Sequence, residues 1–208
     1  MQKTLLAVAL TAALSPSFVM AEKGDIVVRL RATNINPDEK SKLDQYIGGE
    51  NKLEVGSNTI PELDISYYFT KNIAAELILA VGSRHDVTLN TGSSKIDLGK
   101  VNLLPPTLLA QWHFNPDQTF DPYVGAGVSY IRAMDNGLDL NGAPIRIDRN
   151  SWGPALQAGM DWNLQDRWLV NVDVKKIWFD TDVKMNGAKI DKLDIDPWVV
   201  SVGFGKKF

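Results

Sequence analysis

The C-terminal stretch constrains the fold more than any other part of this sequence. From Trp198 to Phe204, every second residue is large and apolar, and most of the residues between them are small or polar. An alternation with a period of two predicts a β-strand with two unlike faces. A strand of this length is about twice the usual length in soluble proteins. It suits a tilted membrane crossing, which takes roughly 9–11 residues.

Seven further segments repeat this pattern of one nearly uncharged face and one face with charges, amides and glycines. With the terminal strand, they are 25–35, 60–70, 72–81, 103–114, 121–134, 151–164, 167–183 and 198–208. Aromatic residues gather toward the strand ends on the uncharged faces, as in the aromatic girdles of membrane barrels. The pattern predicts an all-β fold: an eight-stranded antiparallel up-and-down transmembrane β-barrel with its apolar face toward lipid. A soluble β-sandwich, with the apolar face inward, is the alternative.

The polar faces would then point into the barrel. We expect their charged residues to form a plug of ion pairs, because buried charges need partners. The candidates are Arg29, Arg31, Glu76, Asp161 and Asp173. Glycines on the same faces, such as Gly125 and Gly159, are expected mainly to offset large side chains, since an eight-stranded barrel has little interior room.

The N-terminus has the features of a secretory signal peptide. Lys3 supplies a positive charge, residues 5–14 are apolar, and Val19-Met20-Ala21 is a small-residue cleavage pattern. We therefore expect residues 1–21 to be a signal peptide and 22–208 a single outer-membrane barrel domain. Beyond this segment, no window has the 18 or so apolar residues of a membrane helix, so a spanning chain must form a closed barrel.

The composition argues against several functions. The chain of 208 residues has no cysteine, two histidines and a net charge of −3, which offers no thiolate metal site and no basic patch for nucleic acid. His85 is expected in a loop and His113 near the periplasmic end, too far apart for one metal or catalytic site. A lipid-modifying barrel enzyme would need a serine, a histidine and an acid together at the outer end. We predict no enzyme activity, no metal and no cofactor.

The predicted connections alternate in length. Residues 70–72, 115–119 and 165–166 are short turns, whereas 36–59, 82–102, 135–150 and about 184–194 are long and rich in Gly, Asn, Asp and Lys. Outer-membrane barrels have short periplasmic turns and long extracellular loops. The long segments are therefore predicted to be extracellular loops that form a funnel. The acidic first loop could also bind cations or another surface, although a solvated loop is the simpler interpretation.

Several runs resemble the OmpW/AlkL family. They are Asn72–Leu77, Leu104–Leu108 with Ala110-Gln-Trp112, Pro122–Gly127, Ser151–Gly153, Trp168–Asn171 and Asp196–Trp198, and they occur in the family's order. The resemblance implies an outer-membrane barrel with a narrow, largely hydrophobic lumen near its outer end. It also implies passive uptake of small hydrophobic molecules, with lateral exit into the bilayer.

The resemblance also implies where the lumen narrows. It places Ile78 and Lys175 at a constriction where the family has an apolar residue and a tryptophan, so the lysine makes the floor polar. Near the end of the chain, Lys206 stands where an aromatic residue is usual.

From these features we expect a monomeric channel in the outer membrane of a Gram-negative bacterium. Ile78, Leu109 and Leu169 would line the path above Lys175. Pro105 and Pro106 would open the wall, because proline gives no amide hydrogen to the ladder; alternatively, a strand simply begins at Thr107. The expected partners are outer-membrane lipid and lipopolysaccharide, small hydrophobic solutes, and the barrel-assembly machinery through Phe208. The alternative function is a non-conducting structural or receptor barrel that acts through its loops.

Overall fold

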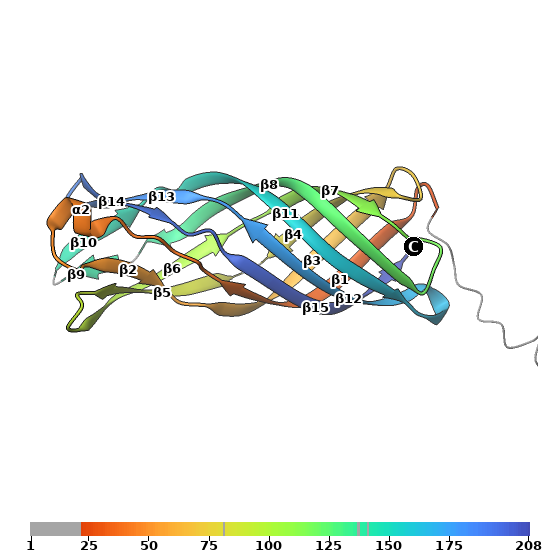
Figure 1. Ribbon diagram of the computed structural model, residues 1–208, viewed down its shortest axis with the longest axis horizontal. Helices are drawn as coiled ribbons and strands as arrows, with labels where there is room; N and C mark the ends of the chain where they lie inside the picture. The colour runs from red at the N-terminus through yellow and green to blue at the C-terminus, as the bar shows by residue number, and fades with distance from the viewer. Residues whose placement is uncertain (1–21, 81, 137, 141) are drawn as a thin grey trace, which may run out of the picture.

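The computed structural model describes residues 22–80, 82–136, 138–140 and 142–208, so the predicted signal peptide 1–21 lies outside the described residues. Eight long antiparallel strands form a closed barrel (Figure 1). They are β1 (Ile26–Asn36), β3 (Asn58–Tyr68), β4 (Ile73–Ala80), β7 (Thr107–His113), β8 (Phe120–Asn136), β11 (Asn150–Asn163), β12 (Trp168–Ile177) and β15 (Trp198–Lys207). Each strand pairs with the next, and β15 closes the ring on β1, with Arg31 opposite Gly203.

The two faces of these strands differ as the alternation predicts. Val170 and Val172 on β12 are 37% and 44% exposed, and Val200 and Val202 on β15 are each 54% exposed. The charged residues lie inside instead: Arg29, Glu76 and Asp173 are at most 4% exposed. At the level of these residues the interior is polar and the outer surface apolar, which is the reverse of a soluble sandwich and fits a surface that faces lipid.

Aromatic side chains surround the barrel near both ends. Those near the short turns are Tyr67, Phe69, Trp112, Phe114, Phe120, Trp162, Trp168 and Phe208, and those toward the other end are Trp152, Trp178 and Trp198; all are at least 37% exposed. Such belts are typical of the two membrane–water interfaces. At the short-turn end, connections are brief, as in the turn η1 (Gln165–Arg167) between β11 and β12.

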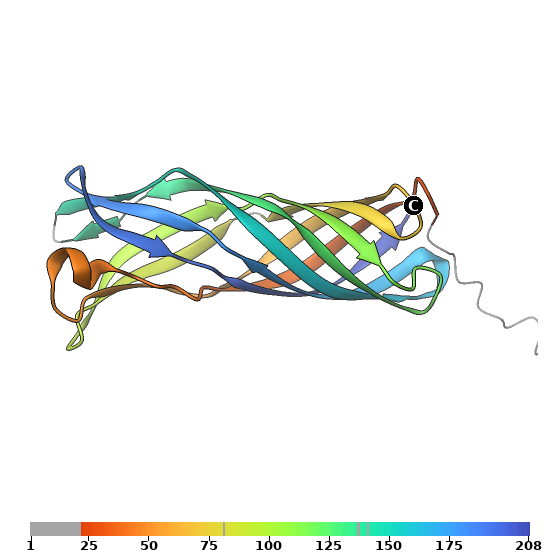
Figure 2. The same cartoon turned by 45° about the horizontal axis from the view of Figure 1, so that its top comes forward.

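The predicted long connections are present, and they contain strands that the sequence analysis did not predict. Residues 82–102 form a hairpin of β5 (Ser83–Asn90) and β6 (Lys95–Leu104), and β2 (Lys52–Val55) joins its edge. A separate four-stranded sheet contains β9 (Leu138–Leu140), β10 (Ala143–Ile147), β13 (Asp180–Met185) and β14 (Ala188–Asp194). The short helix α2 (Leu43–Ile47) lies beside them at this end, which we call the hairpin end (Figures 1 and 2).

A second alternation explains why these segments fold. Val87, Leu89, Leu98 and Val101 are inward and at most 7% exposed. The Gly, Asn and Asp content that suggested loops supplies the tight turns instead: Gly92 has φ of +79° and Asn186 has φ of 51°. Among the described residues, no helix is both long enough and apolar enough to cross a membrane.

Candidate functional site

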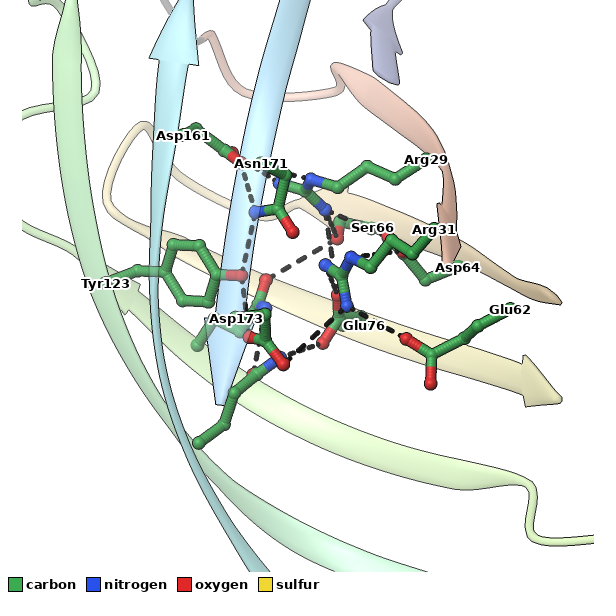
Figure 3. Close-up of polar contacts among 12 residues, drawn as sticks. Arg29, Arg31, Glu62, Asp64, Ser66, Glu76, Tyr123, Asp161, Asn171 and Asp173 are labelled. Carbon is green, nitrogen blue, oxygen red and sulfur yellow. Dashed lines mark hydrogen bonds and ion pairs between the residues drawn. The ribbon is translucent and has the colours of Figure 1, made fainter. Parts of the chain in front are cut away.

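The centre of the barrel is filled by charged side chains that pair across it (Figure 3). We call this cluster the ion-pair plug and define it as Arg29, Arg31, Glu62, Asp64, Glu76, Asp161, Asp173 and Lys175. Every member is at most 4% exposed. The plug draws on β1, β3, β4, β11 and β12, so it ties opposite walls together.

Arg29 forms the layer nearest the short turns. Its Nε and Nη2 donate to the two carboxylate oxygens of Asp161 at 3.2 and 2.5 Å. Its Nη1 donates to Asp64 at 3.1 Å and to Ser66 Oγ at 2.8 Å. The paired contact with Asp161 is the bidentate arrangement that makes arginine–carboxylate bonds strong.

Arg31 forms the next layer, two residues along β1. Its Nη2 lies 2.9 Å from Glu76 Oε1, its Nη1 3.3 Å from Glu62 Oε1, and its Nε 3.0 Å from Asp64 Oδ2. The second oxygen of Glu76 accepts a hydrogen bond from Gln157 at 2.7 Å. One guanidinium therefore connects three carboxylates.

Lys175 forms the layer nearest the hairpin end. Its Nζ donates to Asp173 at 2.8 Å and to Glu62 at 3.2 Å, and the Tyr123 hydroxyl donates to Asp173 at 2.8 Å. The structure brings together all five residues expected in the plug. It adds Glu62, Asp64 and Lys175. Glu62 and Asp64 could have been predicted, because they alternate with apolar residues along β3.

Glycines on neighbouring strands make room for this cluster. Arg29 lies opposite Gly205 and Arg31 opposite Gly203. A Cβ added at Gly205 would lie 2.7 Å from Arg29 Cγ, and one at Gly159 would lie 2.4 Å from the Tyr123 ring. These glycines hold space for plug side chains rather than for a passage.

A second polar cluster lies between the plug and the short turns. His113 Nδ1 is 2.7 Å from Asp121 Oδ2, and Tyr68 OH is 3.1 Å from His113 Nε2. His113, Asp121 and Asp161 have potential ligand atoms within 4.8 Å of one another. Both oxygens of Asp161 already accept from Arg29, so the geometry fits a hydrogen-bonded network better than a metal site.

The lumen changes character on the other side of the plug, where it holds an apolar cavity. Its empty volume is about 610 Å³, counted out to its open mouth. Ile78, Ile131, Ile177, Phe179 and Val199 are among its apolar lining residues, and Glu62 and Lys175 also line it. A second apolar cavity shares Val55, Leu103 and Ile195 with the first. Apolar surface is therefore continuous from the hairpin end down to the plug.

The residues expected along the path have different positions. Ile78 lines the cavity. Leu109 is buried in the same apolar cluster but pairs with Glu76, at the level of the plug. Leu169 packs with Val27, Tyr68 and Ala74 on the far side of the plug, so its expected place above Lys175 was wrong. The reason is strand direction: β12 begins at the short-turn end, and Leu169 is its second residue.

The ladder between β4–β5 and β6–β7 has a gap in the pairs of its described residues beside the cavity. The last pair of β4 with β7 is Ile78 with Thr107, and the first pair of β5 with β6 is Ser83 with Leu103. No backbone pair joins the described residues between these two pairs. Pro105 and Pro106 occupy the interruption and have no N–H to donate. The strand does begin at Thr107, as the alternative held, and the described residues beside the two prolines form no pair with them across this part of the wall.

On its other side, the segment that contains Pro105 and Pro106 is hydrogen-bonded to β8. Tyr130 N donates to Pro106 O at 2.9 Å, so the segment stays on β8. Pro105, Ala80 and Ser83 line the cavity. The cavity therefore extends to the interrupted part of the wall.

One buried polar pair was missed by the sequence analysis. His85, expected in a loop, is on β5 and only 2% exposed; its Nε2 lies 2.6 Å from Ser83 Oγ and its Nδ1 2.7 Å from the Gly56 carbonyl. Burial lowers the pKa of His85, although the Gly56 bond and Asp86 act in the opposite direction. Because Nδ1 faces a backbone carbonyl rather than a carboxylate, the pair lacks the acid of a catalytic triad.

Comparison with known proteins agrees with this architecture. Residues 22–208 match the OmpW family. Outer membrane protein W of Escherichia coli is 36% identical over 214 residues, covering 99% of this chain and 98% of that protein. Outer membrane protein AlkL of Ectopseudomonas oleovorans is 30% identical over 156 residues, covering 73% and 66% of the two chains.

A solved structure also matches closely. The crystal structure of the outer membrane protein OprG from Pseudomonas aeruginosa superposes with a TM-score of 0.80 at 32% identity, covering 91% of this chain and 98% of that one. These relatives are outer-membrane barrels rather than enzymes. The fold, the lipid-facing surface and the sequence match agree: the chain belongs to the OmpW family of outer-membrane β-barrel proteins of Gram-negative bacteria.

Proposed function

We propose that this protein conducts small hydrophobic molecules passively across the lipopolysaccharide leaflet. Solutes enter at the hairpin end, which faces outward, and occupy the apolar cavity above the plug. They leave sideways into the bilayer through the interruption beside Pro105 and Pro106. The observation that carries the proposal is an apolar cavity that ends on the ion-pair plug and reaches a break in the β-ladder.

The cavity supplies the thermodynamic reason for entry. Moving apolar surface out of water is favourable by about 25 cal/mol per Å². The two apolar cavities give a hydrophobic solute an alternative to crossing the polar sugars and phosphates of the outer leaflet. No energy input is needed, because the solute moves down its gradient.

The plug supports a lateral rather than a straight route. Arg29, Arg31 and Lys175 are each bonded to carboxylates on other strands, and Gly203 and Gly205 leave the space that the two arginine side chains fill. Separating such buried partners is costly, because each lone charge would be left in a medium of low dielectric constant. A solute that reaches Lys175 therefore meets a closed floor, and the interrupted wall is the remaining exit.

The experiment is uptake by vesicles whose outer leaflet contains lipopolysaccharide. Replacing Ile78 by Trp fills the cavity from its wall, and we expect uptake of ethylbenzene to fall by about tenfold or more. The matched control is Leu79→Trp, because Leu79 is the next residue on β4 and its side chain points outward, 36% exposed. Unchanged uptake in Ile78→Trp would contradict the path. The structural or receptor barrel would then be the better account.

We propose two further partners. Phe208 is 60% exposed on the outer surface, and its N–H bonds Ile26 O at 2.8 Å. An accessible aromatic end suits recognition by the barrel-assembly machinery. Trp152, Trp178 and Trp198 mark the outer interface, where lipopolysaccharide would contact the wall. Assembly yield of Phe208→Ala in cells tests the first partner, with Phe204→Ala as the control for loss of an outward phenylalanine.

A further inference from the structure

Most of the polar groups that line the apolar cavity can accept a hydrogen bond from a bound molecule but cannot donate one. Besides the plug residues Glu62 and Lys175, they are Ser83, His85 and Thr107. Their hydrogen-bond partners determine what each can still offer a molecule in the cavity. A group whose hydrogen is already donated can only accept.

Ser83 and His85 are fixed as acceptors by a backbone carbonyl. The Gly56 carbonyl can only accept, so His85 Nδ1 carries the hydrogen in their 2.7 Å bond. The neutral ring then has an unprotonated Nε2, which accepts from the Ser83 hydroxyl at 2.6 Å. What remains on Ser83 is the lone-pair capacity of Oγ.

The Thr107 hydroxyl has also already donated its hydrogen within the wall. Its hydroxyl donates to the Pro105 carbonyl at 3.2 Å, and it lies 2.8 Å from Ser129 Oγ. The hydrogen of Thr107 is therefore used within the wall. It does not offer the cavity a donor.

Glu62 presents an acceptor on the floor. Its Oε1 receives both Arg31 and Lys175, whereas no described residue donates to Oε2. Figure 3 shows this second oxygen turned away from the plug. A buried carboxylate oxygen has strong capacity for a donor, because charge-assisted bonds are roughly twice as strong as neutral ones.

The charge of the plug, which forms the floor of the cavity, also favours a ligand that donates a hydrogen bond over an anionic ligand. The ion-pair plug has three cationic side chains and five carboxyl groups, so its formal balance is negative. Lys175 could donate to an anion, but its ammonium is already shared between Asp173 and Glu62. A carboxylate that entered the cavity would add a further negative charge close to Glu62.

We propose that the cavity selects apolar molecules that carry one hydrogen-bond-donating head group, an alcohol or an amine. Hydrocarbons of the same size and apolar carboxylates bind less well. The head donates to Ser83 Oγ in the wall or to Glu62 Oε2 on the floor, and the apolar body lies against residues such as Ile78 and Ile131. This inference rests on the proposed function, whose cavity it uses.

The test compares four probes with one apolar body: 2-phenylethanol, 2-phenylethylamine, ethylbenzene and 3-phenylpropionate. Each is titrated at equal free aqueous concentration into protein in lipid nanodiscs, and the methyl NMR signal of Ile78 reports binding. We expect the alcohol and amine to bind about three- to tenfold more tightly than ethylbenzene, as one net hydrogen bond predicts. The carboxylate should be weakest.

Two variants separate the acceptors. Ser83→Ala alone would leave His85 Nε2 free to accept, so Ser83→Ala is combined with His85→Phe to remove the wall acceptor. This double variant should reduce the preference for the alcohol, while Glu62→Gln should reduce the preference for the amine. Ser93→Ala, in an exposed hairpin turn, is the matched control. Glu62 is a plug residue, so heat-modifiable gel migration checks that each variant is folded, and the double variant of Ser83 and His85 tests the idea without touching the plug.

The outcomes distinguish two failures. If ethylbenzene binds as tightly as the alcohol and the amine, or if 3-phenylpropionate binds best, the head-group inference is wrong while the cavity path stands. If no probe moves the Ile78 signal, the proposed function itself fails.

Discussion

The two halves of the lumen are built on the same strands yet have opposite chemistry. On β4, Glu76 belongs to the plug and Ile78 to the apolar cavity, one inward position further along. On β12, Lys175 and Ile177 make the same change. On β4 and β12 the change occurs within one continuous strand, so the boundary there is set by which side chain occupies each inward position. A barrel of this size can therefore be closed in one half and hollow in the other.

The largest expected effect comes from disrupting the ion-pair plug, which closes one half of the lumen. Arg31→Ala leaves Glu76, Asp64 and Glu62 without their shared cation, and we expect it to lower the free energy of unfolding by about 3–5 kcal/mol. Urea unfolding in lipid vesicles measures the change. Arg84→Ala, at an exposed arginine on β5, should stay within about 0.5 kcal/mol. Equal effects of the two variants would mean that the plug does not hold the barrel together.

A smaller effect should come from overfilling the same half. A Cβ at Gly203 would lie 2.1 Å from the Leu30 carbonyl oxygen and 2.9 Å from Arg31 Cγ. Gly203→Ala should therefore cost about 1–3 kcal/mol, measured by the same unfolding assay. Val202→Ala, on the outward face next to it, removes lipid contact without crowding the plug. A neutral Gly203→Ala would contradict the close packing of the arginine layer.

Changes in the half of the lumen that holds the apolar cavity should alter transport rather than stability. Replacing Pro105 and Pro106 together by alanine supplies N–H groups that could pair across the interrupted ladder. We expect uptake of ethylbenzene into vesicles to fall about two- to fivefold, with folding unchanged. Pro144→Ala in the second sheet is the control for loss of a proline. Unchanged uptake in the double variant would remove the lateral exit.

The smallest effect concerns pH at the hairpin end. The pKa of His85 lies below its ordinary value in the folded state because the ring is buried. The unfolded chain thus binds more protons as pH falls below about 6.5, and stability decreases there. His85→Gln should show a shallower loss of stability between pH 7 and pH 5, measured by unfolding at each pH. Parallel curves for the two proteins would contradict the burial of a neutral ring.

Much of this architecture followed from alternation alone, because inward and outward residues of a strand must differ when one face meets lipid. The five predicted plug residues are brought together for that reason. The strands within the long connections were not predicted, because Gly, Asn and Asp indicate turns but do not show how much strand lies between them. His85 was placed in a loop by the same error, so its bond with Ser83 could not be foreseen. Leu169 was misplaced because its level along the barrel axis depends on the direction of its strand. The alternation of the two faces does not give that direction.

The contrast between the two halves is tested most directly by measuring solute and ion flux together. Vesicles with a lipopolysaccharide-containing outer leaflet are loaded with a potassium-sensitive dye and exposed to ethylbenzene and potassium. We predict faster ethylbenzene entry with the protein than without it, no increase in potassium entry, and loss of the ethylbenzene effect in Ile78→Trp. If potassium and ethylbenzene fluxes rise together and fall together in that variant, the lumen is a continuous water-filled pore, and the closed plug with lateral exit is wrong.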